Sequence, residues 1–464
     1  MLGVTEEKDL YLSSFTQFEK THSQTEPSWV GDIRKGAIAR FIKLGFPTTR
    51  NEDWRFTSVA PIAKIPFGLA AFPSNGVTGK TLERFTFGNW ASHTLVFLNG
   101  HFSQKLSSLR TLSRGAQLSN LATALRRDPA GLEAQLGRYA NYDDHPFVAL
   151  NTAFISDGAF VYIPKDTIVE EPIHLLFIAT ASGEPQVSHP RNLIVAGANT
   201  QAKIVESYVG LDNAVYFTNA VTEIVAGENS VIDHYKLQRE SVHAFHVATL
   251  QIQQARSTSF STHSISMGGA LVRNDVNAVL DGEGCESVLN GLYLVRGQQH
   301  VDNHTKIDHA KPHCSSRELY KGILDEKARG VFNGRIIVRP GAQKTDSKQT
   351  NKNLLLSEEA LVNTNPQLEI YADDVKCTHG ATIGQIDENA LFYLRSRGID
   401  ELSARKLLLF AFASECLDRM KPSPAREQVE KLIHSYLLQV ANSANNFATG
   451  TSSEDSRRTW EEIG

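Results

Sequence analysis

The residues best suited to chemistry lie in one run, from His300 to Cys314, which holds five possible nitrogen or sulfur ligands. Imidazole and thiolate groups at this density are typical of zinc and iron sites. In an extended strand His300, Asp302 and His304 would share a face, whereas His309, at odd spacing, would point away. The alternative is a polar core in which these side chains bond to each other and to the backbone. The spacing favours the polar core, and a zinc or iron site remains the alternative.

A sparser pair, Cys377 and His379, is separated by one residue. On a strand these side chains would face the same side, with Cα atoms about 6.6–7 Å apart. Thiolate and imidazole together suit zinc, iron or part of an iron–sulfur cluster. Two ligands cannot complete a four-coordinate site, so the others must come from elsewhere in the chain or from a partner. A buried structural pair is the competing interpretation.

Residues 76–81, Gly-Val-Thr-Gly-Lys-Thr, are similar to a phosphate-binding loop only in outline. Such a loop needs a small residue five positions before the glycine of its Gly-Lys pair and a strand ahead of it. Here Ser74 follows Pro73, where the strand should end. We therefore interpret the segment as a surface turn and expect no ATP hydrolysis. GxSxG, HExxH and GxGxxG motifs are also absent from the sequence, so an enzyme has little support.

Composition narrows the class of protein. The 47 Lys and Arg against 51 Asp and Glu leave a net charge of −4, which argues against a broad nucleic-acid-binding surface. No stretch reaches the roughly 18 apolar residues of a membrane helix, and the first thirty residues hold no apolar signal core. The four cysteines form no CxxC pair, so we expect reduced thiols in a cytoplasmic protein.

Periodicity predicts three regions. Residues 1–92 are mostly helical, with one helix ending at Gly45-Phe46-Pro47. Residues 93–386 form a β core that begins with a strand near 95–98 and carries a helical insertion at about 118–138. Residues 387–464 are helical, with Asp400 as an N-cap and a polar tail from about 442.

Within the β core, apolar residues alternate with period two between recurrent turns. Val276, Ala278 and Leu280 would share one side, as would Leu250 and Ile252. Some 240 residues of strand are too many for one small barrel, whereas a sandwich or a β-solenoid accommodates them. The pattern alone does not choose between these two folds.

Several ordered segments together resemble the SufB/SufD family of iron–sulfur cluster assembly proteins, over about residues 51–415. These are Asn-Glu-Asp-Trp-Arg at 51–55, Arg-Asn-Asp at 273–275, Leu-Asn-Gly-Leu-Tyr at 289–293, the run from 300 to 322, Lys-Cys-Thr-His-Gly-Ala-Thr at 376–382 and Leu-Phe-Tyr-Leu-Arg-Ser-Arg-Gly at 391–398. The resemblance implies a right-handed parallel β-helix between helical ends.

The resemblance is to the SufD subunits rather than to the SufB scaffold. SufB proteins carry a cluster-building cysteine and a glutamate in a HEAT-like motif, and the matching positions here are Asn351 and Gly380. His379 matches the histidine that SufD proteins place at the SufB–SufD interface, with Cys377 beside it. The resemblance thus implies that SufB completes this metal-binding pair.

The resemblance also implies that the chain is a non-enzymatic subunit with two partners. It would bind SufB through the β-helix and the SufC ATPase through the C-terminal helices, where residues 402–417 carry an apolar stripe. We expect no permanent cofactor, only iron or an iron–sulfur cluster held transiently; flavin binding by the assembled complex is neither encoded nor excluded. For the isolated chain a homodimer is the alternative to the pair with SufB, and we expect no nucleic-acid or membrane partner.

Two other functions compete with this one. A zinc- or iron-dependent enzyme would use the cluster from His300 to Cys314 and would lose its metal on His304→Ala. A purely structural solenoid would keep cluster assembly intact when Cys377 and His379 are both replaced by alanine.

Overall fold

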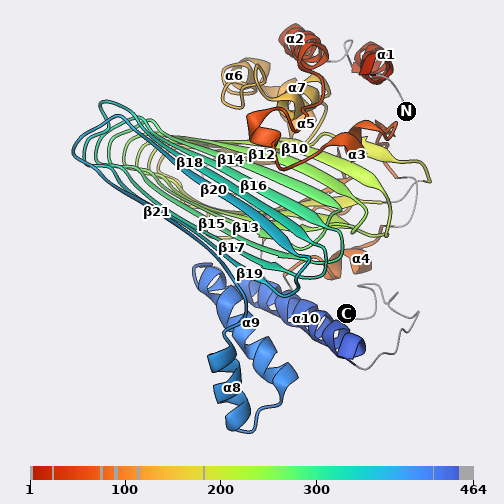
Figure 1. Cartoon of the computed structure of the whole chain (residues 1–464). Coiled ribbons are helices and arrows are strands. Elements are labelled where there is room, and N and C mark those ends of the chain that lie inside the picture. The colour runs from red at the N-terminus through yellow and green to blue at the C-terminus, as the bar shows by residue number, and fades with distance from the viewer. Residues whose placement is uncertain are drawn as a thin grey trace.

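The computed structural model describes residues 4–22, 26–73, 77–87, 92–110, 112, 115–180, 183–421 and 423–448. Its core is a β-solenoid in which successive strands alternate between two facing sheets (Figure 1). Among the described residues one sheet has 11 strands and the other 10. We call them sheet A and sheet B. The predicted parallel β-helix between helical ends is confirmed, and the sandwich is excluded.

The strands of sheet A are β1 (Gly68–Leu69), β4 (Gln117–Asn120), β5 (Ala159–Ile163), β7 (Gln186–Ser188), β8 (Arg191–Ala196), β10 (Tyr216–Ala226), β12 (Phe245–Gln254), β14 (Leu271–Leu280), β16 (His300–His309), β18 (Arg329–Val338) and β20 (Leu361–Ile370). Those of sheet B are β2 (His93–Leu98), β3 (His101–Phe102), β6 (Ile173–Ala179), β9 (Gln201–Gly210), β11 (Val231–Arg239), β13 (Ser259–Ser266), β15 (Glu286–Val295), β17 (Ser315–Leu324), β19 (Asp346–Leu355) and β21 (Lys376–Gly384).

Parallel register aligns each residue with the residue one coil earlier, so that Leu271 pairs with His300 and His300 with Arg329. Alternation then sends every second side chain into the lumen between the sheets. Val276, Ala278 and Leu280 are buried there, as the period-two pattern predicts. The β-strands bury both faces because helices cover much of the outside, which is the usual condition for parallel sheets.

The turns between the strands repeat the same residue types from coil to coil. Asn199 and Asn229 have φ of 56°, a left-handed conformation that asparagine tolerates. A buried column of hydroxyl and thiol side chains follows the turns: Thr200, Ser230, Thr258, Cys285, Cys314 and Thr345. The thiols of Cys285 and Cys314 both donate to the carbonyl of Gly282, at 3.1 and 3.2 Å, so these cysteines serve as turn residues.

The N-terminal elements pack on the outer face of sheet A (Figure 1). They are α1 (Val4–His22), α2 (Ser28–Leu44), η1 (Glu52–Trp54), α3 (Ala60–Ala63) and α7 (Pro146–Ala153), while α4 (Gly79–Glu83) lies beside sheet B. The helix predicted to stop at Gly45 does so, with φ of 68° at that glycine. Thr78 caps α4 by accepting a hydrogen bond from the Thr81 amide; Gly76, in the phosphate-loop-like segment, lies outside the described residues.

The helical insertion predicted at about 118–138 is wrong at its start. Residues 117–120 form β4, which pairs antiparallel with β5, and only then do α5 (Leu121–Arg127) and α6 (Pro129–Glu133) follow. Leu118 supplies the reason, because it is buried in the solenoid core and is held there by strand pairing. The three predicted domain boundaries remain predictions.

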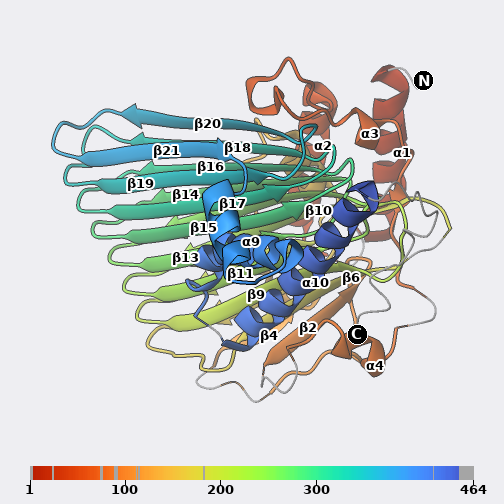
Figure 2. The ribbon, with the colours of Figure 1, turned by 60° about the horizontal axis from the view of Figure 1, so that its bottom comes forward.

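The C-terminal helices α8 (Glu388–Ser396), α9 (Glu401–Leu417) and α10 (Ser423–Ala448) follow the last strand, and α9 and α10 cover the outer face of sheet B (Figure 2). Asp400 caps α9 as predicted, accepting from the Ser403 amide at 2.9 Å. The buried stripe of α9 differs from the predicted one, since Leu409 is buried whereas Leu407 is exposed. The prediction had placed on the stripe Leu402, Leu407, Leu408, Phe410, Ala411 and Leu417. The predicted polar tail is helical as far as Ala448, and its remainder lies outside the described residues. No helix among the described residues is long and apolar enough to cross a membrane.

A buried cation ties α9 to the solenoid. Lys321 on β17 donates to the carbonyl of Phe412 at 2.8 Å, lies 4.2 Å from the centre of that ring, and pairs with Glu415. Its side chain is only 3% exposed, whereas that of Lys352, which also pairs with Glu415, is 38% exposed.

We expect Lys321→Met to lower the free energy of unfolding by about 2 kcal/mol, because Glu415 and a carbonyl lose a charged donor. Lys352→Met is the matched control and should change it by about 0.5 kcal/mol or less, since its ion pair is solvated. Urea unfolding of both variants measures the difference. Equal effects of the two substitutions would contradict the anchoring role of Lys321.

Candidate functional site

The last coil of the solenoid carries the predicted metal-binding pair. β21 pairs with β19 and ends the order of sheet B, just as β20 pairs with β18 and ends sheet A (Figure 2). No described strand pairs with the far edge of either, so the backbone groups along those edges have no ladder partner. Every residue of β21 is exposed except Cys377, which is half-buried.

Cys377 and His379 continue lumen-facing columns. Cys377 is in register with the buried Ser347, and it packs against the solenoid core. His379, two residues on, shares that face and is in register with the buried Gln349. The predicted common face of the two side chains is thus present, at the mouth of the lumen.

The thiol of Cys377 is not activated. Burial raises its pKa, the backbone amide of Ser347 lowers it by less, and the charge of Asp346 raises it further. Because a metal binds the thiolate, an incoming ion would have to displace the proton. One neutral thiol and one imidazole do not form a closed site, and among the described residues no three His, Cys, Asp or Glu side chains gather as a metal would require.

Exposed apolar side chains surround this end. Leu361, Ile370, Tyr371 and Ile383, all on or next to the last two strands, are between 41% and 60% exposed. Together with the unpaired edges they form a surface that we call the end face. Long edges with apolar side chains are uncommon on proteins that act alone, because they invite pairing with another chain.

The cluster from His300 to Cys314 does not converge. His300, Asp302 and His304 lie on the outer face of β16, toward Thr57 of the N-terminal segment. His309 points away from these three residues, as predicted, and lies in the lumen, where its ring bonds to Ser316 at 3.0 Å.

The other two members of the cluster lie at a turn. His313 has φ of 59° and an exposed side chain, while Cys314 is buried. The preferred interpretation, a polar core, describes the outer triad and His309 better than a metal site does.

Asp302 is held as a structural carboxylate. It accepts from Arg273 at 2.6 Å and from Thr57 at 2.5 Å, and it lies 3.1 Å from His304. Burial alone would raise its pKa, but Arg273 and His304 lower it well below the usual range. The guanidinium also packs 4.3 Å from the ring of Trp54. This network fastens the N-terminal segment to sheet A.

Two grooves of about 330 and 270 Å³ lie beside the network, between the N-terminal elements and the outer face of sheet A. Their walls mix Arg335 and Lys306 with Asp53 and Asp144, and thus select no single ligand charge.

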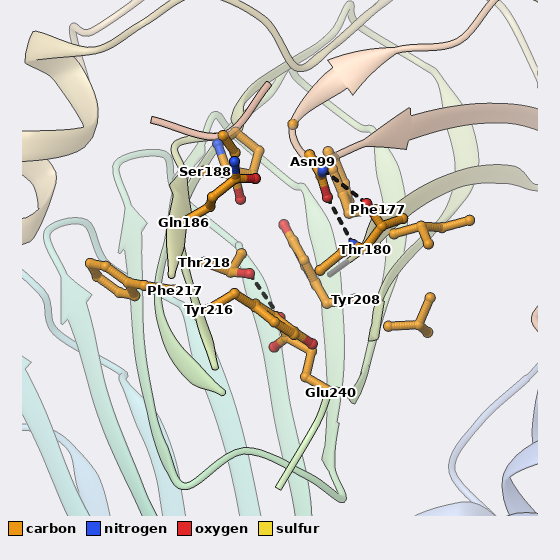
Figure 3. Close-up of a pocket in the computed structure, with 16 residues that line it drawn as sticks. Asn99, Phe177, Thr180, Gln186, Ser188, Tyr208, Tyr216, Phe217, Thr218 and Glu240 are labelled. Atoms are coloured by element: carbon orange, nitrogen blue, oxygen red, sulfur yellow. Dashed lines mark hydrogen bonds between the residues drawn. The ribbon is translucent and has the colours of Figure 1, made fainter. Parts of the chain in front are cut away.

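The lumen holds polar side chains that the sequence analysis did not single out. Figure 3 shows Tyr208, Tyr216, Thr218 and Glu240 around a small pocket near its first coils, with Thr218 donating to Glu240 at 2.8 Å. Further along, Glu318 lies in register with Leu289 on one side and Gln349 on the other. Burial raises the pKa of Glu318 to about 7. Along β19 the buried positions Ser347, Gln349, Asn351 and Asn353 are all polar, and this alternation is a signal in the sequence for a polar lumen.

Comparison with known proteins agrees with this architecture. The model for the SUF system FeS cluster assembly SufBD core domain matches residues 177–412, and the model for the SufBD protein N-terminal region matches residues 5–175. The chain therefore belongs to the SufB/SufD family of iron–sulfur cluster assembly proteins.

Individual relatives refine the assignment. An iron–sulfur cluster assembly SufBD family protein of Synechocystis is 36% identical over 86% of this chain and 89% of its own. The iron–sulfur cluster assembly protein SufD of Escherichia coli is 31% identical over 84% and 89%. SufD of Bacillus subtilis is 26% identical over 91% and 96%. Within the family the chain is thus similar to proteins named SufD.

We expect Asp302→Asn to destabilise the fold by about 3 kcal/mol without changing metal content, because it leaves a buried guanidinium short of one anion. The stabilisation by Asp302 should be fully present above the pKa of an aspartate in the unfolded chain, about 3.9. It should be lost as the pH falls through the lower pKa that Asp302 has in the folded chain. Asp308→Asn, whose partner Arg339 is 54% exposed, is the control and should cost about 1 kcal/mol at most.

Unfolding curves and elemental analysis of the purified chain measure both quantities. Loss of a stoichiometric metal on Asp302→Asn or His304→Ala would instead support the metal-dependent enzyme.

Proposed function

We propose that the chain is a SufD-like subunit of a cytoplasmic SufB–SufC–SufD complex, in which it supports iron entry and cluster building without catalysing a reaction itself. The observation that carries the proposal is an incomplete ligand pair, Cys377 and His379, on the unpaired last strand of a solenoid. Iron and the cluster are cargo in this proposal, so the chain needs no permanent cofactor. Flavin binding would belong to the assembled complex.

The end face suits a second solenoid of the same family. Its two parallel edges could each receive a strand, so that both sheets continue across the interface, as in β-strand addition. Exposed apolar side chains such as Tyr371 and Ile383 would be buried there. SufB would then supply the remaining ligands to Cys377 and His379. A homodimer through the same face is the alternative arrangement of the isolated chain.

The C-terminal helices offer a separate surface for SufC. Phe392 and Tyr393 on α8 are 73% and 57% exposed, and Leu407 on α9 is 51% exposed. These side chains point away from the apolar cluster that holds α9 and α10 to sheet B. An ATPase bound there would act on a helix that Lys321 fastens to β17, and its motion would strain or open the SufB interface and admit iron and sulfide.

We expect His379→Ala to leave assembly of the complex intact but to abolish most cluster formation, since the interface loses one ligand. The tagged chain is co-purified with SufB and SufC, the complex is reconstituted with iron and sulfide, and cluster absorbance is read. Thr378→Ala, exposed on the opposite side of the same strand, is the matched control. Unchanged cluster absorbance in His379→Ala and in Cys377→Ala/His379→Ala would leave the purely structural solenoid as the better description.

We expect Phe392→Ser to weaken SufC binding by roughly 30-fold, the effect of removing one central aromatic contact of about 2 kcal/mol. SufB should still co-purify. The control is Ile168→Ser, because Ile168 is 55% exposed but lies on the solenoid rather than on α8. Titration of the purified SufB–SufD pair with SufC gives the dissociation constants. The docking assignment is wrong if both variants bind SufC as the unmodified chain does.

A further inference from the structure

One buried amide lies in the register position next to the candidate site. The side chain of Gln349 is almost fully buried, and its Nε2 donates to Oε2 of Glu318 at 2.7 Å. Its other polar atom, Oε1, has no hydrogen-bond partner among the described residues. A buried carbonyl oxygen without a donor is uncommon and calls for a physical reason.

Register identifies the missing donor. Glu318, Gln349 and His379 occupy the same lumen-facing position on β17, β19 and β21. Neighbouring parallel strands are about 4.8 Å apart, which is within reach of a glutamine side chain and an imidazole in adjacent positions. The amide directs its NH₂ group to Glu318, so its carbonyl oxygen remains free to accept from a neighbouring donor such as His379.

Two contacts hold the amide. Its Nε2 donates to a carboxyl oxygen of Glu318, an arrangement that the ionised form of Glu318 favours because that form only accepts hydrogen bonds. On the opposite sheet Gly334 leaves the space that the amide fills, since a Cβ there would lie 2.2 Å from Nε2. Any larger residue at position 334 would have to displace Gln349.

The column formed by Glu318, Gln349 and His379 ends at an apolar residue on its inner side. Leu289, fully buried in the apolar core, occupies the register position before Glu318. The rings of Tyr320 and Phe332, 5.2 Å apart, lie on neighbouring positions of the two sheets. Glu318 is therefore the innermost polar residue of this column, and Gln349 and His379 follow it toward the last coil.

We propose that Gln349, anchored by Glu318, is a positioning residue for His379: when the exposed imidazole turns toward the lumen, Oε1 accepts the N–H of one ring nitrogen and so presents the lone pair of the other nitrogen to an incoming iron ion. Imidazole ligands commonly gain their orientation and tautomer from such a carbonyl acceptor. The binding of iron by His379 rests on the proposed function, whereas the hydrogen bond between His379 and Gln349 does not depend on it.

The tautomer is measured first, on the full chain labelled with [¹⁵N]histidine. Long-range ¹⁵N–¹H correlation spectra report one protonated and one bare ring nitrogen for a fixed tautomer, and the His379 signals are assigned from His379→Ala. We expect a single tautomer in the unmodified chain and averaged nitrogen shifts in Gln349→Met, which fills similar space without the carbonyl. Thr350→Val, on the outward side of β19, is the control. Identical His379 shifts in the unmodified chain and Gln349→Met would overturn the proposal, provided that the other histidine signals report an intact fold.

Iron binding is measured second, in the reconstituted complex. Gln349→Met should weaken iron retention about 10-fold or more, the usual effect of losing the acceptor behind an imidazole ligand. The double variant Glu318→Gln/Gln349→Glu exchanges the two residues, which keeps one donor and one acceptor between them. It should recover most of the iron retention. In a His379→Ala background Gln349→Met should have no further effect.

The two measurements separate the two claims. If Gln349→Met lowered iron retention equally in the unmodified chain and in the His379→Ala background, Gln349 would act on the fold. The positioning role would then be rejected. A fixed tautomer together with full cluster assembly by His379→Ala would instead reject the proposed function and leave the hydrogen bond standing.

Discussion

The structure depends on one constraint, the parallel in-register pairing that aligns each residue with its equivalent one coil earlier. Each coil obtains its hydrogen bonds and its apolar neighbours from the coils before and after it. The last coil, β20 and β21, has such a neighbour on one side only among the described strands. The pairing that stabilises the interior thus leaves the end face unsatisfied, and the candidate metal-binding residues lie on it.

The same pairing explains how a lumen between two sheets tolerates so many polar groups. Register brings complementary groups to adjacent positions, as where Gln349 donates to Glu318, or where Asn192 donates to Thr222 at 3.0 Å. A buried carboxyl or amide is costly only when it lacks a partner. Within such a ladder an unpartnered atom is informative, because the coil that should supply its partner is known.

The sequence predicts the fold well where the signal is local. The period-two pattern at Val276 to Leu280 and the cap at Asp400 both hold in the structure. The wrong assignment at residues 117–120 arises because a short segment of mixed polarity becomes a strand only through its partner β5. Tertiary pairing overrides weak local preference in such cases.

The site was predictable only in part, for a related reason. Cys377 and His379 stand out by residue type and spacing, whereas Glu318 and Gln349 acquire meaning only through register. The coil length changes from 28 residues between His234 and Thr262 to 31 between Ser316 and Ser347. A fixed repeat read from the sequence would therefore lose the alignment of Gln349 with His379 within a few coils.

The strand β17 joins the two surfaces on which the proposed function depends. Its outward side chain Lys321 holds α9, while its lumen-facing Glu318 holds the amide of Gln349 behind His379. Both contacts are buried, and both are made by residues three positions apart on one strand. In the proposed function, a force that SufC applied to α9 would reach β17 through Lys321. Glu318, three positions away on the same strand, faces the other side of the sheet, so the contact to α9 and the contact to Gln349 lie on opposite faces of one sheet.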